Sequence, residues 1–118
     1  MVTVPVTVVE TPQFLRQAEN VWTEGERAGF IDFVARNPEA GDLIPETGGV
    51  RKVRWRRQGS GKRGGVRVIY FYHTANAPLF LLMIYAKAVR EDVSSDAKNA
   101  LADFSARLKR SLRHEREG

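Results

Sequence analysis

The chain has 118 residues, of which 42% are hydrophobic and 28% are charged, a balance typical of one globular domain and too apolar for a disordered chain. It contains no cysteine, and its two histidines, His73 and His114, are far apart, which excludes disulfides and thiolate chemistry and makes a metal site unexpected. No apolar run is long enough for a membrane span and the N-terminus lacks a basic signal segment, so we expect a cytoplasmic protein that makes no membrane contact.

Positive charge is concentrated in the middle of the chain. The 44 positions between Glu46 and Glu91 contain ten lysines and arginines and no acidic residue, whereas the remainder has nine bases against fourteen acids. Such a block creates a positive field that attracts polyanions, most often nucleic acid. The alternative is a solvated basic face that only aids solubility.

The first third of the chain predicts one strand and two helices. Residues 2–9 alternate and are β-branched, which predicts a strand, and Pro5 favours a place at a sheet edge. Thr11 followed by Pro12 indicates a helix start, and apolar residues at helical spacing continue to residue 22. The segment from Thr23 to Glu26 has the spacing of a capping box and opens a second helix that stops at residues 37–38.

The rest of the chain predicts three strands and a last helix. Residues 50–55, 67–72 and 79–86 are alternating or β-branched runs separated by connectors, which favours an antiparallel meander. Ser94 or Ser95 caps a helix with an apolar stripe to Leu112. The predicted order is β-α-α-β-β-β-α, a single α+β domain over residues 1–118, with the helices packed on one face of an antiparallel sheet.

The glycine-rich stretch at residues 56–67, RRQGSGKRGGVR, contains the letters G-S-G-K of a phosphate-binding loop. The P-loop pattern fails, because Arg56 stands where its first glycine should be and Arg63 stands where its hydroxyl should be. A strand rather than a helix is also expected to follow. We therefore predict a hairpin loop that presents bases to phosphates, or a solvated hairpin without a ligand. The four bases of this loop are Arg56, Arg57, Lys62 and Arg63.

The period of a strand sorts the basic residues onto one face of the predicted sheet. If Val53 and Trp55 point toward the helices, then Lys52, Arg54 and Arg56 share the opposite face. On the next strand Arg67 shares a face with Ile69 and Phe71, and on the last strand Tyr85 shares a face with Met83 and Lys87. A face of arginine, lysine and tyrosine suits single-stranded nucleic acid, because guanidinium groups bind phosphate and rings stack on bases. Two further aromatic residues are expected in the core: Trp55 and Phe80.

Three segments together resemble a known family: NPEAGDLIPETGGVRKVRW, GSGKRGGVRVIYFY and LFLLMIYAKAVREDVS. Their glycine, basic and tyrosine positions are similar to those of the RelE/HigB-like toxins of bacterial type II toxin–antitoxin systems, nearest to the HigB branch, over roughly residues 10–112. The resemblance implies a small microbial-RNase-like fold and metal-free, cofactor-free cleavage of mRNA in the A site of the 70S ribosome. It also implies a monomeric toxin that forms a hetero-oligomer with a cognate HigA-like helix-turn-helix antitoxin.

The resemblance also implies roles for individual residues. Arg67 would clamp the phosphate and the transition state, while Lys52 and Arg54 would add positive charge. Tyr85 and Lys87 would orient the RNA or take part in proton transfer. His73 is expected as an exposed turn residue without a catalytic role. Binding to mRNA or ribosomal RNA would involve a further group of bases: Arg51, Arg56, Arg57, Lys62 and Arg63.

Two other functions stay open at this point. A ParE-like inhibitor of DNA gyrase belongs to the same superfamily but does not cut RNA. A non-catalytic RNA- or DNA-binding module would use the same basic face without chemistry. The cationic set built around Arg67 favours the nuclease, because inhibition of gyrase does not need a cationic catalytic face.

Overall fold

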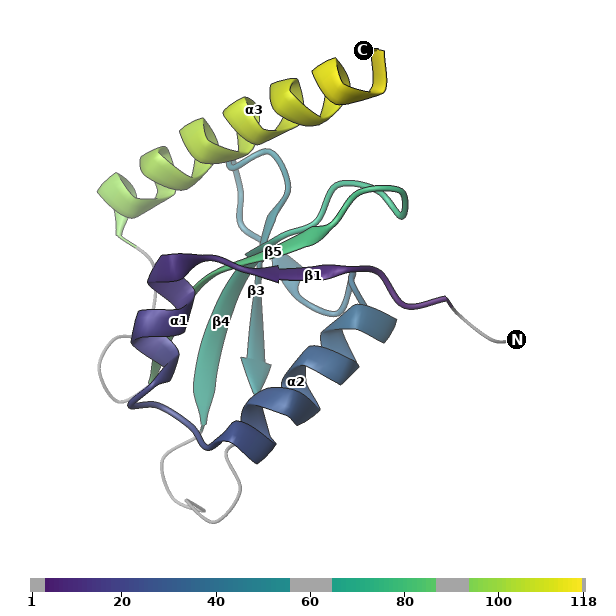
Figure 1. Cartoon of the computed structure of the whole chain (residues 1–118). Coiled ribbons are helices and arrows are strands. Elements are labelled where there is room, and N and C mark those ends of the chain that lie inside the picture. Colours follow the sequence, from purple (N-terminus) through teal and green to yellow (C-terminus); the bar gives the residue numbers. More distant parts are fainter. Residues whose placement is uncertain (1–3, 56–64, 87–93, 118) are drawn as a thin grey trace.

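The computed structural model of the protein describes residues 4–55, 65–86 and 94–117, the side chains of residues 114–117 excepted. Eight elements follow one another along these residues (Figure 1). In chain order they are β1 (Val8–Glu10), α1 (Pro12–Ala18), α2 (Glu24–Arg36), β2 (Asp42–Leu43), β3 (Val50–Trp55), β4 (Val66–Phe71), β5 (Leu79–Ala86) and α3 (Ser95–Glu117). No helix in the described ranges has the length and apolar character to cross a membrane.

The first two helices begin where the capping signals predicted. Thr11 caps α1, with its Oγ1 accepting a hydrogen bond from Phe14 N at 3.3 Å, and Pro12 occupies the first turn. The capping box of α2 is complete, because Thr23 Oγ1 accepts from Glu26 N at 3.1 Å and Glu26 Oε1 accepts from Thr23 N at 2.8 Å. Helix α1 ends at Ala18 instead of residue 22, because residues 19–22 form a turn on the Ala18 carbonyl.

The sheet has five strands in the order β1-β5-β4-β3-β2. The meander of β3, β4 and β5 is antiparallel, as predicted, and β2 pairs antiparallel with β3. The prediction of an entirely antiparallel sheet is wrong for β1, which pairs parallel with β5. Parallel neighbours need a long crossover, and the two helices and three strands between β1 and β5 provide it.

The first strand is shorter than predicted and the second was not predicted at all. A strand was expected at residues 2–9, whereas the strand in the structure covers residues 8–10 and residues 4–7 lie outside it. Pro5 has no N–H to donate to a ladder, which explains the late start. Strand β2 has two residues, too few for a period-two pattern to appear in the sequence.

Helices cover both faces of the sheet, so the prediction that they pack on one face is wrong. Helices α1 and α2 contribute Phe14 and Phe30 to one core cluster, whereas α3 contributes Leu101 to a second cluster on the other face. All six residues of β4 are buried. A strand that is buried on both sides needs a covering layer on each face, and α3 is the second layer (Figure 1).

A buried tyrosine holds the loop before β2 against the sheet. Tyr70 Oη accepts a hydrogen bond from Gly41 N and donates one to Pro38 O, both at 2.8 Å. Desolvation by burial raises the pKa of Tyr70, and the hydrogen bond from Gly41 offsets part of that rise. Gly41 has to be glycine here, because an added Cβ would lie 2.9 Å from both the Tyr70 ring and Lys52 O.

We predict that Tyr70→Phe lowers the free energy of unfolding by about 1–3 kcal/mol, because it leaves the Gly41 N–H and the Pro38 carbonyl without their partner. Urea unfolding would measure the change. Tyr72→Phe is the matched control, since Tyr72 is only half-buried at the edge of the same cluster. Equal stability of Tyr70→Phe and the wild type would contradict the structural role of this hydroxyl.

The raised pKa of Tyr70 determines in which direction the stability of the fold changes with pH. The folded state holds this phenol in its protonated form more strongly than the unfolded chain does. The contribution of the phenol to the free energy of unfolding is therefore complete below pH 10, the ordinary pKa of tyrosine. Stability should therefore fall as pH rises above about 10. The fall should be smaller in Tyr70→Phe, which a comparison of urea midpoints at pH 9 and pH 11 would show.

Candidate nucleic-acid interface

Three predicted site residues form a row across the middle strands of the sheet. Arg54 on β3 is the register partner of Arg67 on β4, and Arg67 is the register partner of Tyr85 on β5. Directly opposed residues in an antiparallel pair have Cβ atoms about 4.5–5.5 Å apart. Lys52 lies one pair further along β3, opposite Ile69. The structure therefore brings together four of the residues that the sequence analysis grouped.

The register places two arginines directly opposite each other on neighbouring strands. Like charges directly opposite each other on neighbouring strands destabilise a sheet. An anion between Arg54 and Arg67 would turn this repulsion into attraction, and a phosphate is the anion that arginine binds best through paired N–H groups. The electrostatics of the row therefore favour binding of a phosphodiester.

Arg67 is the most unusual member of the row because it is buried. The residue is 6% exposed, and within the described part of the chain its Nη1 is buried without a hydrogen-bond partner. Leaving a buried polar donor unpaired costs about 1–3 kcal/mol, and more for a charged group. By contrast, Arg27 outside the site forms ion pairs with Glu10 and Glu24, each at 2.6 Å. Arg67 is therefore prepared for an acceptor that the described residues do not supply.

The row is closed at one end and open at the other. Tyr85 is 7% exposed and belongs to the buried cluster that also contains Ile69 and, from α3, Leu101. Arg54 at the other end is exposed, and Lys52 is half-buried. A strand of RNA could thus reach Arg67 from the side of β3, with Arg54 and Lys52 meeting the phosphates on either side.

Arg51 is separated from this row. It pairs with Tyr70 across the strands and shares the face of Tyr70, opposite to that of Lys52 and Arg54. Its Nη1 donates hydrogen bonds to Gly41 O at 2.7 Å and Glu39 O at 3.2 Å. The observed contacts of Arg51 therefore hold the loop before β2, and the structure does not bring it together with the other basic residues.

Several predicted residues lie outside the described part of the chain. Lys87 follows directly on the end of β5 at Ala86, and the loop bases belong to residues 56–64 between Trp55 and Val66. Trp55 and Val66 are register partners, so the connection joins two antiparallel neighbours, as predicted. A strand and not a helix follows it, which agrees with the rejection of a P-loop. The loop bases concerned are Arg56, Arg57, Lys62 and Arg63.

The aromatic predictions can be compared with the structure directly. Trp55 packs on the α2 side, with its ring centroid 5.4 Å from that of Phe30 and 5.0 Å from that of Phe33. Phe80 is half-buried against the second core cluster. Both residues pack against the core, as predicted, but are only partly buried. His73 is exposed after β4, as expected of a turn residue.

Sequence reasoning missed two features of the site: the burial of Arg67 and the packing of α3 on the same face of the sheet. The signal was present, because Ile69 and Phe71 alternate with Arg67 on the same face and need a cover. The apolar stripe of α3 could provide that cover. Joining these two patterns would have placed α3 on the basic face and buried the arginine at its edge.

The chain is similar to a known family and to a solved structure. Residues 35–115, more than half of the chain, match the family described as the RelE toxin of the RelE / RelB toxin–antitoxin system. The fold is similar to that of the E. coli toxin RelE in the free state, solved as a variant with two arginine-to-alanine substitutions. That match has a TM-score of 0.53 at 15% sequence identity and covers 74% of this chain and 88% of the other.

Fold and family match define the class: this is a small α+β toxin of a toxin–antitoxin system. More particularly, the chain belongs to the RelE toxin family. The resemblance stated from the sequence is confirmed at the level of this family, and a place in the HigB branch stays a prediction.

We predict that Arg54→Ala weakens binding of a single-stranded RNA oligonucleotide and reduces its salt dependence. Each lost phosphate contact should lower the slope of log K against log salt concentration by about 0.7 for a single strand. Fluorescence anisotropy between about 50 and 200 mM salt measures it. Arg36→Ala is the control, because Arg36 pairs with Asp32 on α2, away from the row. Equal slopes for both variants would contradict the prediction that Arg54 contacts the RNA phosphates.

Proposed function

We propose that this protein is a ribosome-dependent endoribonuclease that cleaves mRNA in the ribosomal A site and so arrests translation. The observation that carries the proposal is Arg67, a buried arginine without a partner for Nη1 among the described residues, set between Arg54 and Tyr85. Family membership supports the toxin part of the proposal. The row supports the chemical part.

In the proposed reaction the 2′-oxygen of the RNA attacks the adjacent phosphorus. The O2′–P bond forms and the P–O5′ bond breaks, which leaves a 2′,3′-cyclic phosphate and a 5′-hydroxyl. The 2′-hydroxyl gives up one proton and the leaving 5′-oxygen takes one. No nucleophile from the protein is required, so the protein needs to stabilise charge on the phosphorane and assist proton transfer.

The side chains of the row suit this division of work. Arg67 would contact the non-bridging oxygens of the phosphorane, because fixed donors in a dry site stabilise developing charge without reorganising. Lys52 and Arg54 would hold the flanking phosphates. Tyr85, with Lys87 beyond the described end of β5, would orient the nucleotide or transfer a proton to or from it.

The proposed role of the ribosome is to align the RNA for the reaction. In-line attack requires the 2′-oxygen, the phosphorus and the 5′-oxygen to be aligned, and a flexible single strand rarely adopts this geometry. Alignment of reacting groups can contribute about 7–11 kcal/mol to a reaction. We propose that the A site holds the mRNA in this geometry, and that the loop bases of residues 56–64 bind ribosomal RNA.

An antitoxin completes the proposed system. The family is defined by a toxin–antitoxin pair, and we propose a HigA-like helix-turn-helix protein, encoded beside this chain, as the partner. The toxin would act in the cytoplasm as a monomer and be held in a hetero-oligomer until the antitoxin is removed.

Arg67→Ala should abolish growth arrest in cells and reduce mRNA cleavage by roughly 10²–10³, the usual loss for one charge-stabilising donor. Mapping of mRNA 5′ ends after induction measures cleavage directly. Arg110→Ala is the matched control, since Arg110 is exposed on α3. Its cleavage pattern should equal that of the wild type.

Two results would overturn the nuclease proposal. Growth arrest by the wild type without new mRNA 5′ ends would favour inhibition of DNA gyrase or non-catalytic binding of nucleic acid. Cleavage by Arg67→Ala at the wild-type rate would remove the row from the chemistry. Thermal unfolding of the variant, followed by circular dichroism, would establish that a loss of activity is not a loss of the fold.

A further inference from the structure

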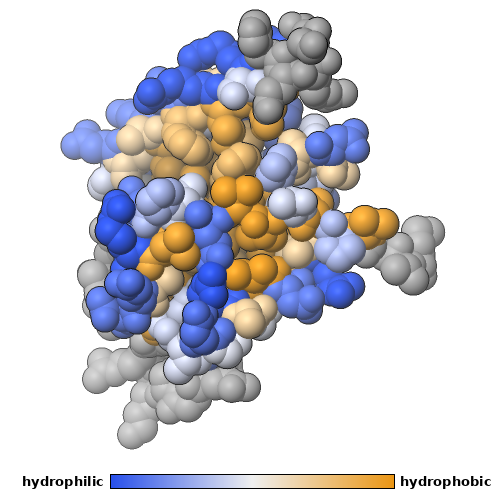
Figure 2. Space-filling view, viewed as in Figure 1, coloured by the Kyte–Doolittle hydropathy of each residue, from blue (hydrophilic) through white to orange (hydrophobic). Residues whose placement is uncertain are grey.

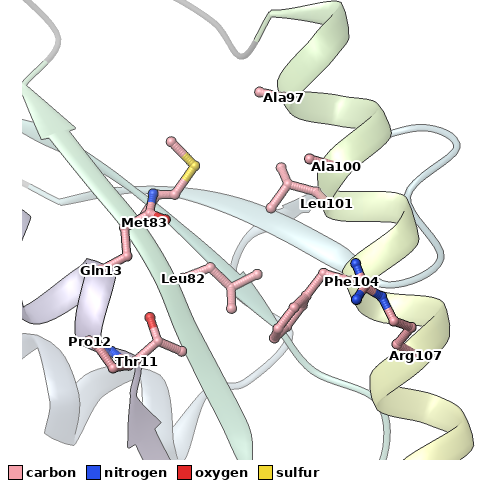
Figure 3. A pocket seen from close by; sticks show the side chains of 10 residues that line it. All are labelled: Thr11, Pro12, Gln13, Leu82, Met83, Ala97, Ala100, Leu101, Phe104 and Arg107. Atoms are coloured by element: carbon pink, nitrogen blue, oxygen red, sulfur yellow. The ribbon is translucent and has the colours of Figure 1, made fainter.

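An apolar groove runs between α1, β5 and α3, beside the basic row. Its volume is about 480 Å³, within the range of binding pockets. Figure 3 shows side chains from the start of α1, from β5 and from one side of α3 around the same space. Ten residues line it: Thr11, Pro12, Gln13, Leu82, Met83, Ala97, Ala100, Leu101, Phe104 and Arg107.

The apolar groove presents hydrophobic surface to solvent. Leu82 and Leu101 are buried, Met83 and Phe104 are half-buried, and Ala100 is exposed. Figure 2 shows hydrophobic residues gathered on this face of the molecule, below α3 and around β1. Contiguous apolar surface of this kind on a monomer marks an interaction site.

The groove begins next to the basic row. Met83 lines it and is the register partner of Ile69, which follows Arg67 on the same face of β4. Because Arg67 pairs with Tyr85, Met83 is the diagonal neighbour of Arg67, and diagonal neighbours lie about 7–8 Å apart. Met83 and Phe104 also pack against the buried cluster that contains Tyr85. A nucleotide with its phosphate at Arg67 could therefore place its base in the groove.

The lining of the groove suits the flat ring of a nucleobase. Unstacked bases of single-stranded RNA bind by stacking on aromatic side chains and by hydrogen bonds to their edges. Phe104 offers a ring for stacking, and the thioether of Met83 is a favourable neighbour of aromatic rings. Gln13 is an exposed member of the lining, and its amide has both donors and an acceptor for the edge of a base.

The charges around the groove favour a ligand that carries phosphate. Arg107 is the charged residue among the ten that line it, and it also pairs with Asp103 on α3. Residues 104–113 of α3 contain four bases and no acid, and α1 carries Arg16 and no acidic residue. A phosphodiester chain that leaves the basic row toward α3 would therefore meet positive charge on both sides of the groove.

We propose that the apolar groove is a base-binding subsite, which holds an unstacked base of the RNA whose phosphate lies at Arg67. The ring would lie against Met83 and Phe104, with its polar edge toward Gln13. These side chains select among RNA sequences, whereas the stabilisation of charge stays with the basic row. The inference rests on the RNA binding that forms part of the proposed function, and it does not depend on how the RNA is cleaved.

The first test separates contacts to bases from contacts to phosphates. The probes are two short 2′-O-methyl oligoribonucleotides of equal length, one with bases and one abasic throughout, and fluorescence anisotropy measures Kd. The wild type should bind the base-bearing oligomer at least about fivefold more tightly, because stacking of a base adds to the phosphate contacts. Ala100→Leu narrows the groove with a neutral side chain. Its Kd for the base-bearing oligomer should rise about fivefold, while its Kd for the abasic oligomer should not change.

Ala106→Leu is the matched control, because Ala106 is exposed on α3 and does not line the groove. It should bind both oligomers with the Kd of the wild type. An unchanged Kd of Ala100→Leu for the base-bearing oligomer, or an equal rise for both oligomers, would overturn the proposal. Equal melting temperatures of the two variants would show that the fold is retained.

The same titrations distinguish the base-binding subsite from the rest of the proposed function. If the wild type binds neither oligomer, the basic row does not bind RNA and both proposals are wrong. If it binds both with the same Kd, the row binds phosphates and the base-binding subsite alone is wrong. Sedimentation of the toxin identifies a competing occupant: a dimer that Ala100→Leu abolishes, with the base preference retained, would mean that the groove joins two toxin copies.

A second variant tests recognition of the base edge. Gln13→Leu should reduce the spread of Kd values among oligomers of adenine, cytosine and uracil by at least about fivefold, because its side chain cannot form a hydrogen bond with the base. Asn99→Leu is the control, since Asn99 is exposed on α3 and its amide lies outside the groove. The same order and spread of Kd values in Gln13→Leu and the wild type would contradict the role given to Gln13.

Discussion

The structure depends on one constraint: the central strand β4 is buried on both faces and still carries an arginine. All six residues of β4 are buried, so helices have to cover both sides of the sheet. Arg67 lies near the start of this strand, between register partners on both neighbours. Its guanidinium is thus held by a rigid element, which is the condition for stabilising charge in a transition state.

Helix α3 links the two surfaces that the structure presents. On one side Leu101 packs in the cluster that contains Tyr85, next to the basic row. On the other side the same helix forms a wall of the apolar groove. The helix is anchored at the turn before β3, where Ser105 Oγ donates a hydrogen bond to Thr47 O. Gly48 has φ 76° there, and a Cβ would lie 2.9 Å from Ser105 Oγ.

Local signals in the sequence predicted the elements well, because each depends on a few neighbouring residues. The capping box of α2 and the period-two run of β3 are of this kind. The parallel pairing of β1 and the position of α3 depend on contacts between distant segments, which no local pattern records. The same holds for the site: the family resemblance grouped Arg54 with Arg67, whereas their register, the burial of Arg67 and the separate contacts of Arg51 required the tertiary structure.

Direct observation of the Arg67 guanidinium is the sharpest test of the account. NMR spectra of the arginine side chains, recorded during titration with a 2′-O-methyl oligoribonucleotide that cannot be cleaved, would show which groups meet phosphate. We expect the Arg67 guanidinium signals to shift and to gain protection from solvent exchange as the RNA binds. Saturation of binding with the Arg67 signals unchanged, while those of exposed Arg54 shift, would contradict it.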